Sequence, residues 1–441
     1  AAGGAQAMVL LARLGIGVAV VAFLSPKISL GLLVFSMLLS PKIGFGAVGG
    51  GREAVLRYDD ILLVVIFLSW LGRTAVSKAR PFITSTPVQL PVLLYTSLAV
   101  LSTALGIIRG EVSAKMSVFY VLKYVEYFLL YFMTVNIVEN EKDIRRYLRL
   151  GALVAVAVTI YAFYYYYGSG PDARATAPFE AVVGSSVNAS EPASLGGYYL
   201  LVFGTLMAFM SEYSGRGFLV FAALLVFMFP AFLLTFSRSS YIGLTFMLPA
   251  MFFLMRKGRL AMMGFVASGL ILLAMLPGIS AKVMDRITMT YQGVYATETF
   301  QTGSAGSIKL EESAAARVHS LQRVIYEKLP KHPFLGWGVT GIGIGDTQYS
   351  LVLGEMGVLG ALVFAWMLYS LFRTAKTVFR LSKDPAMRAL ALGFMVSLVG
   401  LLFQSVGVNT FIIIRIMEPF WFLAAMLSVV HNRLAGEKAS A

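Results

Sequence analysis

The sequence predicts an all-α, polytopic integral membrane protein. Of its 441 residues, 58% are hydrophobic and only 13% are charged, and the mean hydropathy is +0.78. A soluble globule could not bury that much apolar surface and still present a polar exterior, so much of the chain is expected to face lipid. The spacing of the apolar runs, which alternate with short polar or basic loops, supports the same conclusion.

Apolar runs of roughly 17 to 25 residues, the length that crosses a bilayer as a helix, recur along the chain. The first two, 7–24 and 28–43, are short and end in the same phrase, Leu-Ser-Pro-Lys, so they form a thin hairpin or one broken span. The further candidates are 59–72, 90–108, 117–138, 147–167, 195–211, 217–236, 239–255, 260–277, 347–372, 386–407 and 411–430. We expect about twelve transmembrane helices, or thirteen if both early runs span.

Basic residues are concentrated in alternate connecting loops, and this bias predicts the orientation of the chain. The basic loops, among them 142–149 and 373–388, are predicted to be cytoplasmic. The other loops then face outward: 44–58, 109–116, 168–194, the Ser-Arg-Ser-Ser turn at 237–240, 278–346 and 408–411. Orientation therefore accounts for the formal net charge of +14, and nucleic acid is not an expected partner.

One long polar interruption divides the chain into three parts. Residues 1–277 hold the first nine or ten helices, 278–346 form an extracytoplasmic loop between the fourth-last and third-last helices, and 347–441 hold the last three helices and a cytoplasmic tail. In so apolar a protein, polar chemistry is expected to collect in such a loop and in the outward elements opposite it.

Cysteine and histidine counts limit the chemistry. The chain has no cysteine, which excludes disulfides, metal thiolates and a thiol nucleophile, and its three histidines do not suggest a histidine-rich metal site. We therefore expect no metal and no cofactor. The ionisable side chains inside apolar runs, Lys123 with Glu126 and the deeper Glu355, are expected to be paired or buried against protein.

The outward turn with the sequence Leu-Leu-Thr-Phe-Ser-Arg-Ser-Ser places Arg238 at a helix junction among apolar residues. An arginine there suits a phosphate, because its planar fork donates two parallel hydrogen bonds and it does not lose its charge. The alternative is an arginine that only anchors the helix end at the membrane surface. The loop 168–194, which carries Arg174, Glu180 and Glu191, is either a flexible connector or a cover for the substrate.

Residues 307–330 have helical spacing and are predicted to form an amphipathic helix on the membrane surface, with a stripe of Val318, Leu321 and Ile325. Arg317 lies among alanines, where a charge has no apparent role unless an anion approaches. For Arg323, and for the two histidines His319 and His332, a surface or packing role is the alternative to a role in the site.

The segment before the next span contains Gly336, Gly338 and Gly341 in a G-x-G-x-x-G pattern. No strand or Rossmann unit surrounds it, so a nucleotide loop is rejected, and tight approach of the backbone to a ligand or helix is expected instead. Asp346 follows, at the start of the next span, where a carboxylate would either cap the helix or serve the site.

These motifs, in this order, resemble the O-antigen ligase and O-antigen polymerase superfamily. The likeness covers about 195–372 and rests on Thr-Phe-Ser-Arg-Ser-Ser, the loop helix with its arginine, His-Pro-Phe-Leu-Gly-Trp-Gly, and the phrase that begins at Asp346. It implies a GT-C-like, metal-independent glycosyltransferase in the bacterial inner membrane with its active face in the periplasm. Arg238 and Arg317 occupy the positions that hold the donor's diphosphate.

The resemblance also implies the partners. They are a polyprenyl-diphosphate-linked glycan donor, a lipid-linked glycan acceptor and membrane lipids, with a chain-length regulator protein as a further candidate. Ligases of the superfamily have a histidine where this chain has Asp346, and that difference favours a polymerase. The catalytic candidates are Asp346, Arg238 and Arg317; the substrate-binding candidates are Arg238, Arg317, Arg174, Glu191, His319, Arg323 and Tyr349.

Two other functions remain open at this point. A ligase would transfer the glycan to lipid A core or to another acceptor through the same arginines. A polysaccharide flippase or exporter would have a similar number of spans, but it should show internal repeats with broken helices and a site at the membrane midplane. The sequence has no such symmetry, and its polar residues gather on one face, which favours surface chemistry.

Overall fold

The computed structural model describes residues 20–21, 23–47, 53–77, 84–170, 173–179, 191–274, 277–290, 298–301, 307–343, 345 and 347–440. Asp346 and Glu180 lie outside the described residues, as does most of the first candidate span, 7–24.

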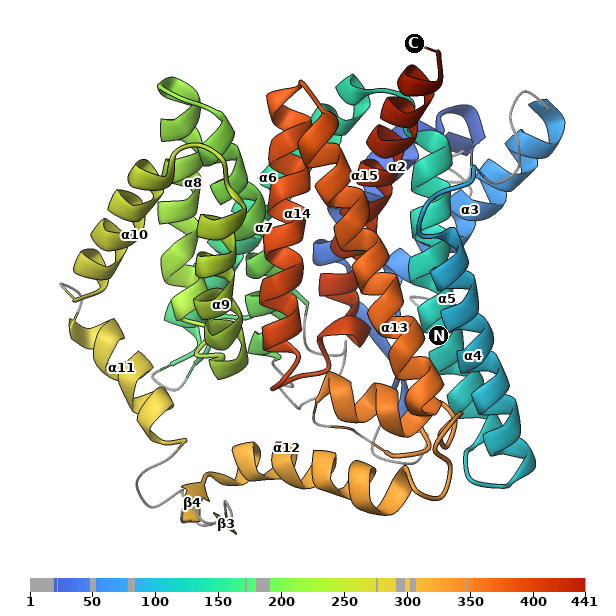
Figure 1. Ribbon diagram of the computed structural model, residues 1–441. Coiled ribbons are helices and arrows are strands. Elements are labelled where there is room, and N and C mark those ends of the chain that lie inside the picture. The colour runs from blue at the N-terminus through green and yellow to red at the C-terminus, as the bar shows by residue number, and fades with distance from the viewer. Residues whose placement is uncertain are drawn as a thin grey trace, which may run out of the picture.

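The described chain is helical apart from two short pairs of antiparallel strands (Figure 1). The N-terminal half holds α2 (Pro26–Leu39), β1 (Lys42–Ala47), β2 (Glu53–Arg57), α3 (Tyr58–Ser77), α4 (Gln89–Ile108), α5 (Ala114–Ile137), α6 (Glu141–Gly168) and α7 (Pro192–Glu212). Next come α8 (Arg216–Leu233), α9 (Arg238–Leu254), α10 (Arg259–Ala274), α11 (Pro277–Thr288), β3 (Glu298–Gln301), β4 (Ser307–Leu310) and α12 (Glu312–Arg323). The chain ends with α13 (Gln348–Leu381), α14 (Pro385–Gln404), a 3-10 turn (Thr410–Ile412) and α15 (Ile414–Ser440).

In the described part of the chain, eight helices are long and apolar enough to cross a membrane: α4, α5, α6, α7, α8, α13, α14 and α15. The prediction of a multi-pass membrane protein is therefore confirmed. The remaining predicted spans from residue 28 onward correspond to α2, α3, α9 and α10, of which α2 has only 14 residues. The pair β1–β2 that follows α2 was not foreseen, because period-2 alternation is hard to see in so short a segment.

The two sets of loops lie at opposite ends of the bundle (Figure 1). The connections α7–α8, α9–α10 and α13–α14 lie at the top with the C-terminus, and α12 lies at the bottom beneath the other helices. Ion pairs join the loops of the first set, from Arg145 to Asp384 and from Arg388 to Glu212 (3.0 Å). We call the top the basic end and the bottom the loop end. This alternation is the one that the basic loops predicted.

The side of the membrane that each end faces stays a prediction, and cysteine labelling tests it. Because the native chain has no cysteine, the exposed Lys331 and Lys383 can each be replaced by cysteine in a clean background. We expect Lys331→Cys to react with an impermeant maleimide in intact cells and Lys383→Cys to react only after lysis. Labelling of both from the same side would contradict the predicted orientation.

Glycine and serine contacts bring α7, α9 and α14 together at the centre of the bundle. A Cβ on Gly204 would lie 2.1 Å from Ser397 Oγ, and one on Gly393 would lie 2.7 Å from the Cα of Thr205 in α7. On the other side of α14, a Cβ on Gly243 would lie 2.7 Å from the carbonyl oxygen of Gly400. Small residues allow such close approach of membrane helices. This packing fixes the N-termini of α7 and α9 next to the C-terminus of α14.

Helix α13 is broken at Gly357, whose φ of 65° and ψ of −165° are not helical. Four backbone hydrogen bonds of 2.8 to 3.2 Å join residues 354–359 to the glycine-containing segment 333–338. A Cβ on Gly336 would lie 2.6 Å from the carbonyl oxygen of Glu355. The interpretation of these glycines as a place of close backbone approach is confirmed. The buried Glu355 accepts a hydrogen bond from the amide of Thr340 (2.7 Å), as expected of a carboxyl group inside a span.

The predicted helix within 307–330 exists, but its bounds differ from the prediction. It begins at Glu312, because residues 307–310 pair with β3 as the strand β4. After α12 the chain makes a π-helical turn, Val324–Lys328. The wider turn changes the register of the side chains: Val324 is 1% exposed, whereas Ile325, a member of the predicted apolar stripe, is 39% exposed.

Candidate functional site

The turn that joins α8 to α9 at the loop end organises the candidate site. The predicted turn 237–240 is shorter than expected, since α9 begins at Arg238. Phe236 has a φ of 47°, which is rare for a bulky residue and recurs where function requires strain. Arg174 holds this conformation, because its Nη2 donates to the carbonyl oxygen of Phe236 (2.9 Å) and its Nε to that of Thr235 (3.0 Å).

Arg174 comes from a segment that is packed into the protein. In the described part of the loop 168–194, residues 175–178 are buried, and the amide of Ala175 donates to the carbonyl oxygen of Leu234 (2.8 Å). Burial, followed by the charges of Arg286 and Arg238, lowers the pKa of Arg174 to about 10. The guanidinium stays charged at neutral pH, but it lies near other cations in a partly buried environment. An anion bound there would relieve that repulsion.

Arg238 is directed toward the long loop 278–346. Its Nη1 donates to Thr290 Oγ1 (2.8 Å) and forms an ion pair with Glu311, immediately before α12. Both side chains of the pair are about one-fifth exposed, at 22% and 21%. A carboxylate thus already occupies the fork of Arg238, in the way that a phosphate oxygen would.

Arg317 reaches the same turn from the middle of α12. Its Nε donates to the carbonyl oxygen of Gly407 (2.6 Å), and its Nη1 donates to Ser313 Oγ (2.9 Å). A Cβ on Gly407 would lie 2.9 Å from Ser239 Cβ and 3.6 Å from Arg317 Nε. The guanidinium of Arg317 therefore lies beside the residue that follows Arg238. The structure brings together the three predicted arginines, Arg174, Arg238 and Arg317, from three distant segments.

Helix N-termini and small hydroxyl groups complete the site. The N-termini of α7 and α9 lie side by side, since Gln404 Nε2 donates both to the carbonyl oxygen of Ala193 (2.9 Å) and to Ser240 Oγ (3.0 Å). Ser240 Oγ in turn donates to Ser237 Oγ (2.8 Å). The backbone amides and the dipole at a helix N-terminus favour an anion. Two such ends, with arginines around them, can bind a group that carries several negative oxygens.

The other predicted residues lie around this arginine cluster with separate contacts. Glu191 is exposed immediately before α7, and His319 is exposed on α12 two residues beyond Arg317. Arg323 Nη2 donates to the carbonyl oxygen of Ile342 (2.7 Å), which ties α12 to the glycine-containing segment. The hydroxyl of Tyr349 donates to the carbonyl oxygen of Leu402 in α14 (2.7 Å).

His332 does not belong to the arginine cluster. Its Nε2 lies 2.8 Å from Glu111 Oε1, and its ring packs edge-on against Trp337 at 4.7 Å between centroids. These contacts link the long loop to the connection between α4 and α5. The packing role that the sequence analysis offered for His332 agrees with them.

Sequence reasoning missed two arginines. Arg286, in α11, is near enough to Arg174 to affect its pKa. Arg415, 2% exposed, donates from Nη2 to the carbonyl oxygen of Phe179 (2.9 Å) and from Nη1 to that of Pro178. It therefore holds the segment of Arg174 in place, and Phe179, like Phe236, has a positive φ, 56°. The sequence did contain a signal for Arg415, because an arginine inside the apolar run 411–430 needs a buried partner.

A second group of charges, missed by the sequence analysis apart from one pair, lies where α3 meets α5 and α15. Arg57 pairs with Asp59 (2.6 Å), and Lys123 pairs with Asp60 and with Glu126 (3.0 Å). The Lys123–Glu126 pair is the one that the sequence predicted. One carboxylate oxygen each from Asp59, Asp60 and Glu418 lies within 4.8 Å of the others, which was not foreseen when no metal site was expected. Arg57 and Lys123 neutralise much of this charge.

Comparison with known proteins identifies no family for the chain. No family model matches the sequence, and no curated protein matches it either.

Proposed function

We propose that this protein is a membrane-embedded glycosyltransferase that polymerises polyprenyl-diphosphate-linked oligosaccharide units at the outer face of the bacterial inner membrane. One observation carries the proposal. Arg174, Arg238 and Arg317 come together at paired helix N-termini, at the end of the bundle that holds the large loop (Figure 1). Such a site, at the end of membrane helices, suits a diphosphate on a lipid.

The chemistry of transfer requires what these residues supply. The oxygen of an acceptor hydroxyl attacks the anomeric carbon of the donor sugar, and the bond from that carbon to the diphosphate oxygen breaks. The electron pair leaves with the polyprenyl diphosphate, while the hydroxyl proton passes to a base or to water. Arginine forks fixed by backbone carbonyls and serines stabilise the charge that develops on the leaving group, and they need no reorganisation to do so.

The pair between Arg238 and Glu311 sets the resting state of this proposed site. Because Glu311 occupies the arginine fork, a diphosphate has to displace it, and displacement frees the start of α12 from α9. Donor binding is therefore coupled to a movement of the loop, and the loop can cover the reacting sugars once the diphosphate is in place. In this scheme the carboxylate keeps the arginine fixed and satisfied until the donor arrives.

The acceptor is assigned to the same face. Asp346 at the start of α13 would orient the acceptor hydroxyl by accepting its hydrogen bond, since a carboxylate with an unperturbed pKa near 4 is a weak base at neutral pH. A lipid-linked repeat unit as acceptor makes the protein a polymerase. Lipid A core as acceptor would make it a ligase, and the histidine that ligases of the resembled superfamily have at this place is absent.

One observation favours a different class, a polysaccharide flippase or exporter. Ionisable residues inside membrane spans often mark a transport pathway, and a group of them, Arg57, Asp59, Asp60 and Glu418, is buried, with Lys123 (12% exposed) beside it. Its charges pair within the group, however, and the arginine cluster lies at one end of the bundle. We therefore rank transport second.

Purified protein and a lipid-diphosphate oligosaccharide test the proposal. With this substrate as both donor and acceptor, we expect a ladder of longer lipid-linked chains on a gel. The N-cap of α13 is Thr347, whose Oγ1 accepts from the amide of Ser350 (3.1 Å), and not Asp346 as the alternative to a site role had it. Asp346→Asn therefore removes the charge and leaves this cap in place, so we expect transfer to fall about tenfold or more while the protein stays folded.

Each alternative predicts a different result in that assay. Transfer only after lipid A core is added would identify a ligase. Movement of the substrate across a sealed vesicle without chain growth would identify an exporter. An Asp346→Asn protein that polymerises at the wild-type rate would remove Asp346 from the catalytic candidates.

A further inference from the structure

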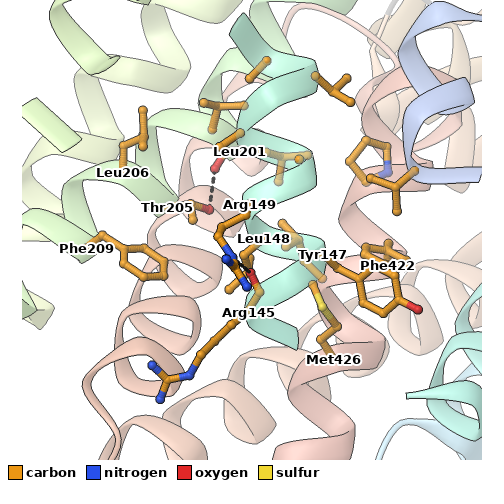
Figure 2. Close-up of a pocket in the computed structure, with 18 of the residues that line it drawn as sticks. Arg145, Tyr147, Leu148, Arg149, Leu201, Thr205, Leu206, Phe209, Phe422 and Met426 are labelled. Carbon is orange, nitrogen blue, oxygen red and sulfur yellow. Dashed lines mark hydrogen bonds between the residues drawn. The ribbon is translucent and has the colours of Figure 1, made fainter. Parts of the chain in front are cut away.

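A groove at the basic end of the bundle is independent of the arginine cluster. It has a volume of about 360 Å³ and lies between α6 on one side and α7 and α15 on the other, with α2, α8 and α14 contributing to its walls. Figure 2 shows Leu201 and Phe209 of α7 facing Leu148 of α6, and Phe422 and Met426 of α15 opposite them. Its walls are mainly apolar.

Two of the hydroxyl groups in these walls are already used elsewhere. The hydroxyl of Thr205 donates to the carbonyl oxygen of Leu201 (2.8 Å), one turn earlier in its own helix. The hydroxyl of Tyr147 donates to the carbonyl oxygen of Lys27 (2.9 Å). An apolar cavity with so few available partners does not hold water well. In a membrane, a hydrocarbon chain is the occupant whose chemistry matches it.

The mouth of the groove is strongly basic. Lys142, Arg145, Arg146 and Arg149 follow one another at positions i, i+3, i+4 and i+7 of α6 and so share one face of the helix. Like charges at this spacing repel, and cations in the first turns of a helix oppose its dipole. A bound anion would offset both the repulsion between these cations and their unfavourable interaction with the helix dipole.

Two arginines at the mouth line the groove itself, and their contacts differ. Arg145 is paired with Asp384, the N-cap of α14. Arg149 is exposed, and its Nε donates to the carbonyl oxygen of Arg145 at 3.3 Å. The acidic residues nearby, Glu141 and Asp143, are engaged with Asp384 and Lys27 respectively.

We infer that this groove is a binding site for an anionic phospholipid of the leaflet at the basic end. One acyl chain fills the apolar space between α6, α7 and α15, and the phosphate of the headgroup lies between Arg149 and Arg145. Arg149 supplies most of the attraction, because Arg145 already has Asp384 as its partner. A basic cluster beside a membrane helix attracts anionic headgroups with a free energy that corresponds to about fivefold in affinity per arginine or lysine.

The chain offers a variant that fills the groove without a clash. Gly151 lines the groove, and a Cβ on it would meet nothing within 4 Å. Gly151→Phe should therefore occupy the space of the acyl chain while α6 gains helix propensity. Gly269→Phe in α10 is the matched control, because a Cβ there also meets nothing within 4 Å and residue 269 is outside the groove.

Native mass spectrometry of the full chain, with phosphatidylglycerol and phosphatidylcholine added in equal amounts, tests the inference. We expect wild-type protein and Gly269→Phe to retain phosphatidylglycerol in preference. Arg149→Gln should lower that preference about fivefold, and Gly151→Phe should lower retention of both lipids. Because Arg149 is exposed, its variant is expected to fold even if the Gly151 variant does not.

Other outcomes would overturn the site. Equal retention of the two lipids by wild-type protein would show that the basic mouth does not select a headgroup. Unchanged retention in a folded Gly151→Phe protein would place the lipid elsewhere. Displacement of the lipid by inorganic phosphate alone, with the acyl chain contributing nothing, would identify an anion site and not a lipid site.

Discussion

Replacement of Arg238 by alanine is expected to abolish measurable transfer while the protein remains folded. Arg238 begins α9 and holds Thr290 and Glu311 from the long loop, so its side chain lies at the surface of the core and not inside it. If it stabilises the charge of the leaving diphosphate, its loss should slow transfer on the order of a hundredfold to a thousandfold. The measurement is the rate of chain growth by the purified variant, normalised to folded protein by size-exclusion chromatography.

Three further variants separate the role of the fork from that of charge alone. Arg238→Lys keeps the charge but loses the two parallel donors, so it should rescue poorly. Glu311→Gln removes the internal anion and should preserve transfer. Arg380→Ala, at an exposed position of the basic end, should behave as wild type. A wild-type rate for Arg238→Ala would exclude the cluster as the diphosphate site, and we expect Arg317→Ala to be impaired in the same way.

The largest loss of stability is expected from Gly357→Ala. The φ of 65° and ψ of −165° at this residue are accessible almost only to glycine, at a cost of about 1 to 3 kcal/mol for another residue. A Cβ there would also lie 2.5 Å from the carbonyl oxygen of Phe334 and 2.7 Å from that of Pro333, and overpacking adds about 1 to 3 kcal/mol. The sum, roughly 2 to 6 kcal/mol, is a large part of the 5 to 15 kcal/mol that stabilises a typical protein.

Thermal unfolding in detergent, followed by tryptophan fluorescence, measures this loss. Gly110→Ala is the matched control, because its φ of 73° is similar but a Cβ there would meet nothing within 4 Å. It should show the backbone cost alone, about 1 kcal/mol. If the two variants unfold at the same temperature, the contact between α13 and the segment 333–338 contributes little.

The sequence predicted the apolar spans and the alternation of loops because both depend on composition within a short window. It also identified Arg238, since a charge at the end of an apolar run is visible without any tertiary contact, and Arg317, since a charge among alanines stands out in the same way. The hydrogen-bond partners of these arginines and of Arg174 could not be predicted. Their partners are mostly backbone carbonyl oxygens, such as those of Phe236 and Gly407, and every residue carries such a group.

Features that depend on packing across the bundle were beyond sequence reasoning. The π-helical turn Val324–Lys328 and the break at Gly357 both interrupt segments whose local pattern is that of an ordinary helix. Each is stabilised by contacts with a distant segment, as the four hydrogen bonds between 333–338 and 354–359 show for α13. Asp346, the sharpest local argument for a polymerase, lies outside the described residues and stays a prediction.

The close packing of α7 on α14 has a consequence for biosynthesis. Helix α7 ends at Glu212 and α14 begins at Pro385, so a ribosome completes many further spans before the partner of α7 exists. Until then the glycine face of α7 lies against lipid or a provisional neighbour, and the carbonyl oxygen of Ala193 at its N-terminus lacks the donor Gln404. A chain released before α14 therefore cannot assemble the arginine cluster, and quality-control proteases that recognise unpaired membrane helices would meet it in that state.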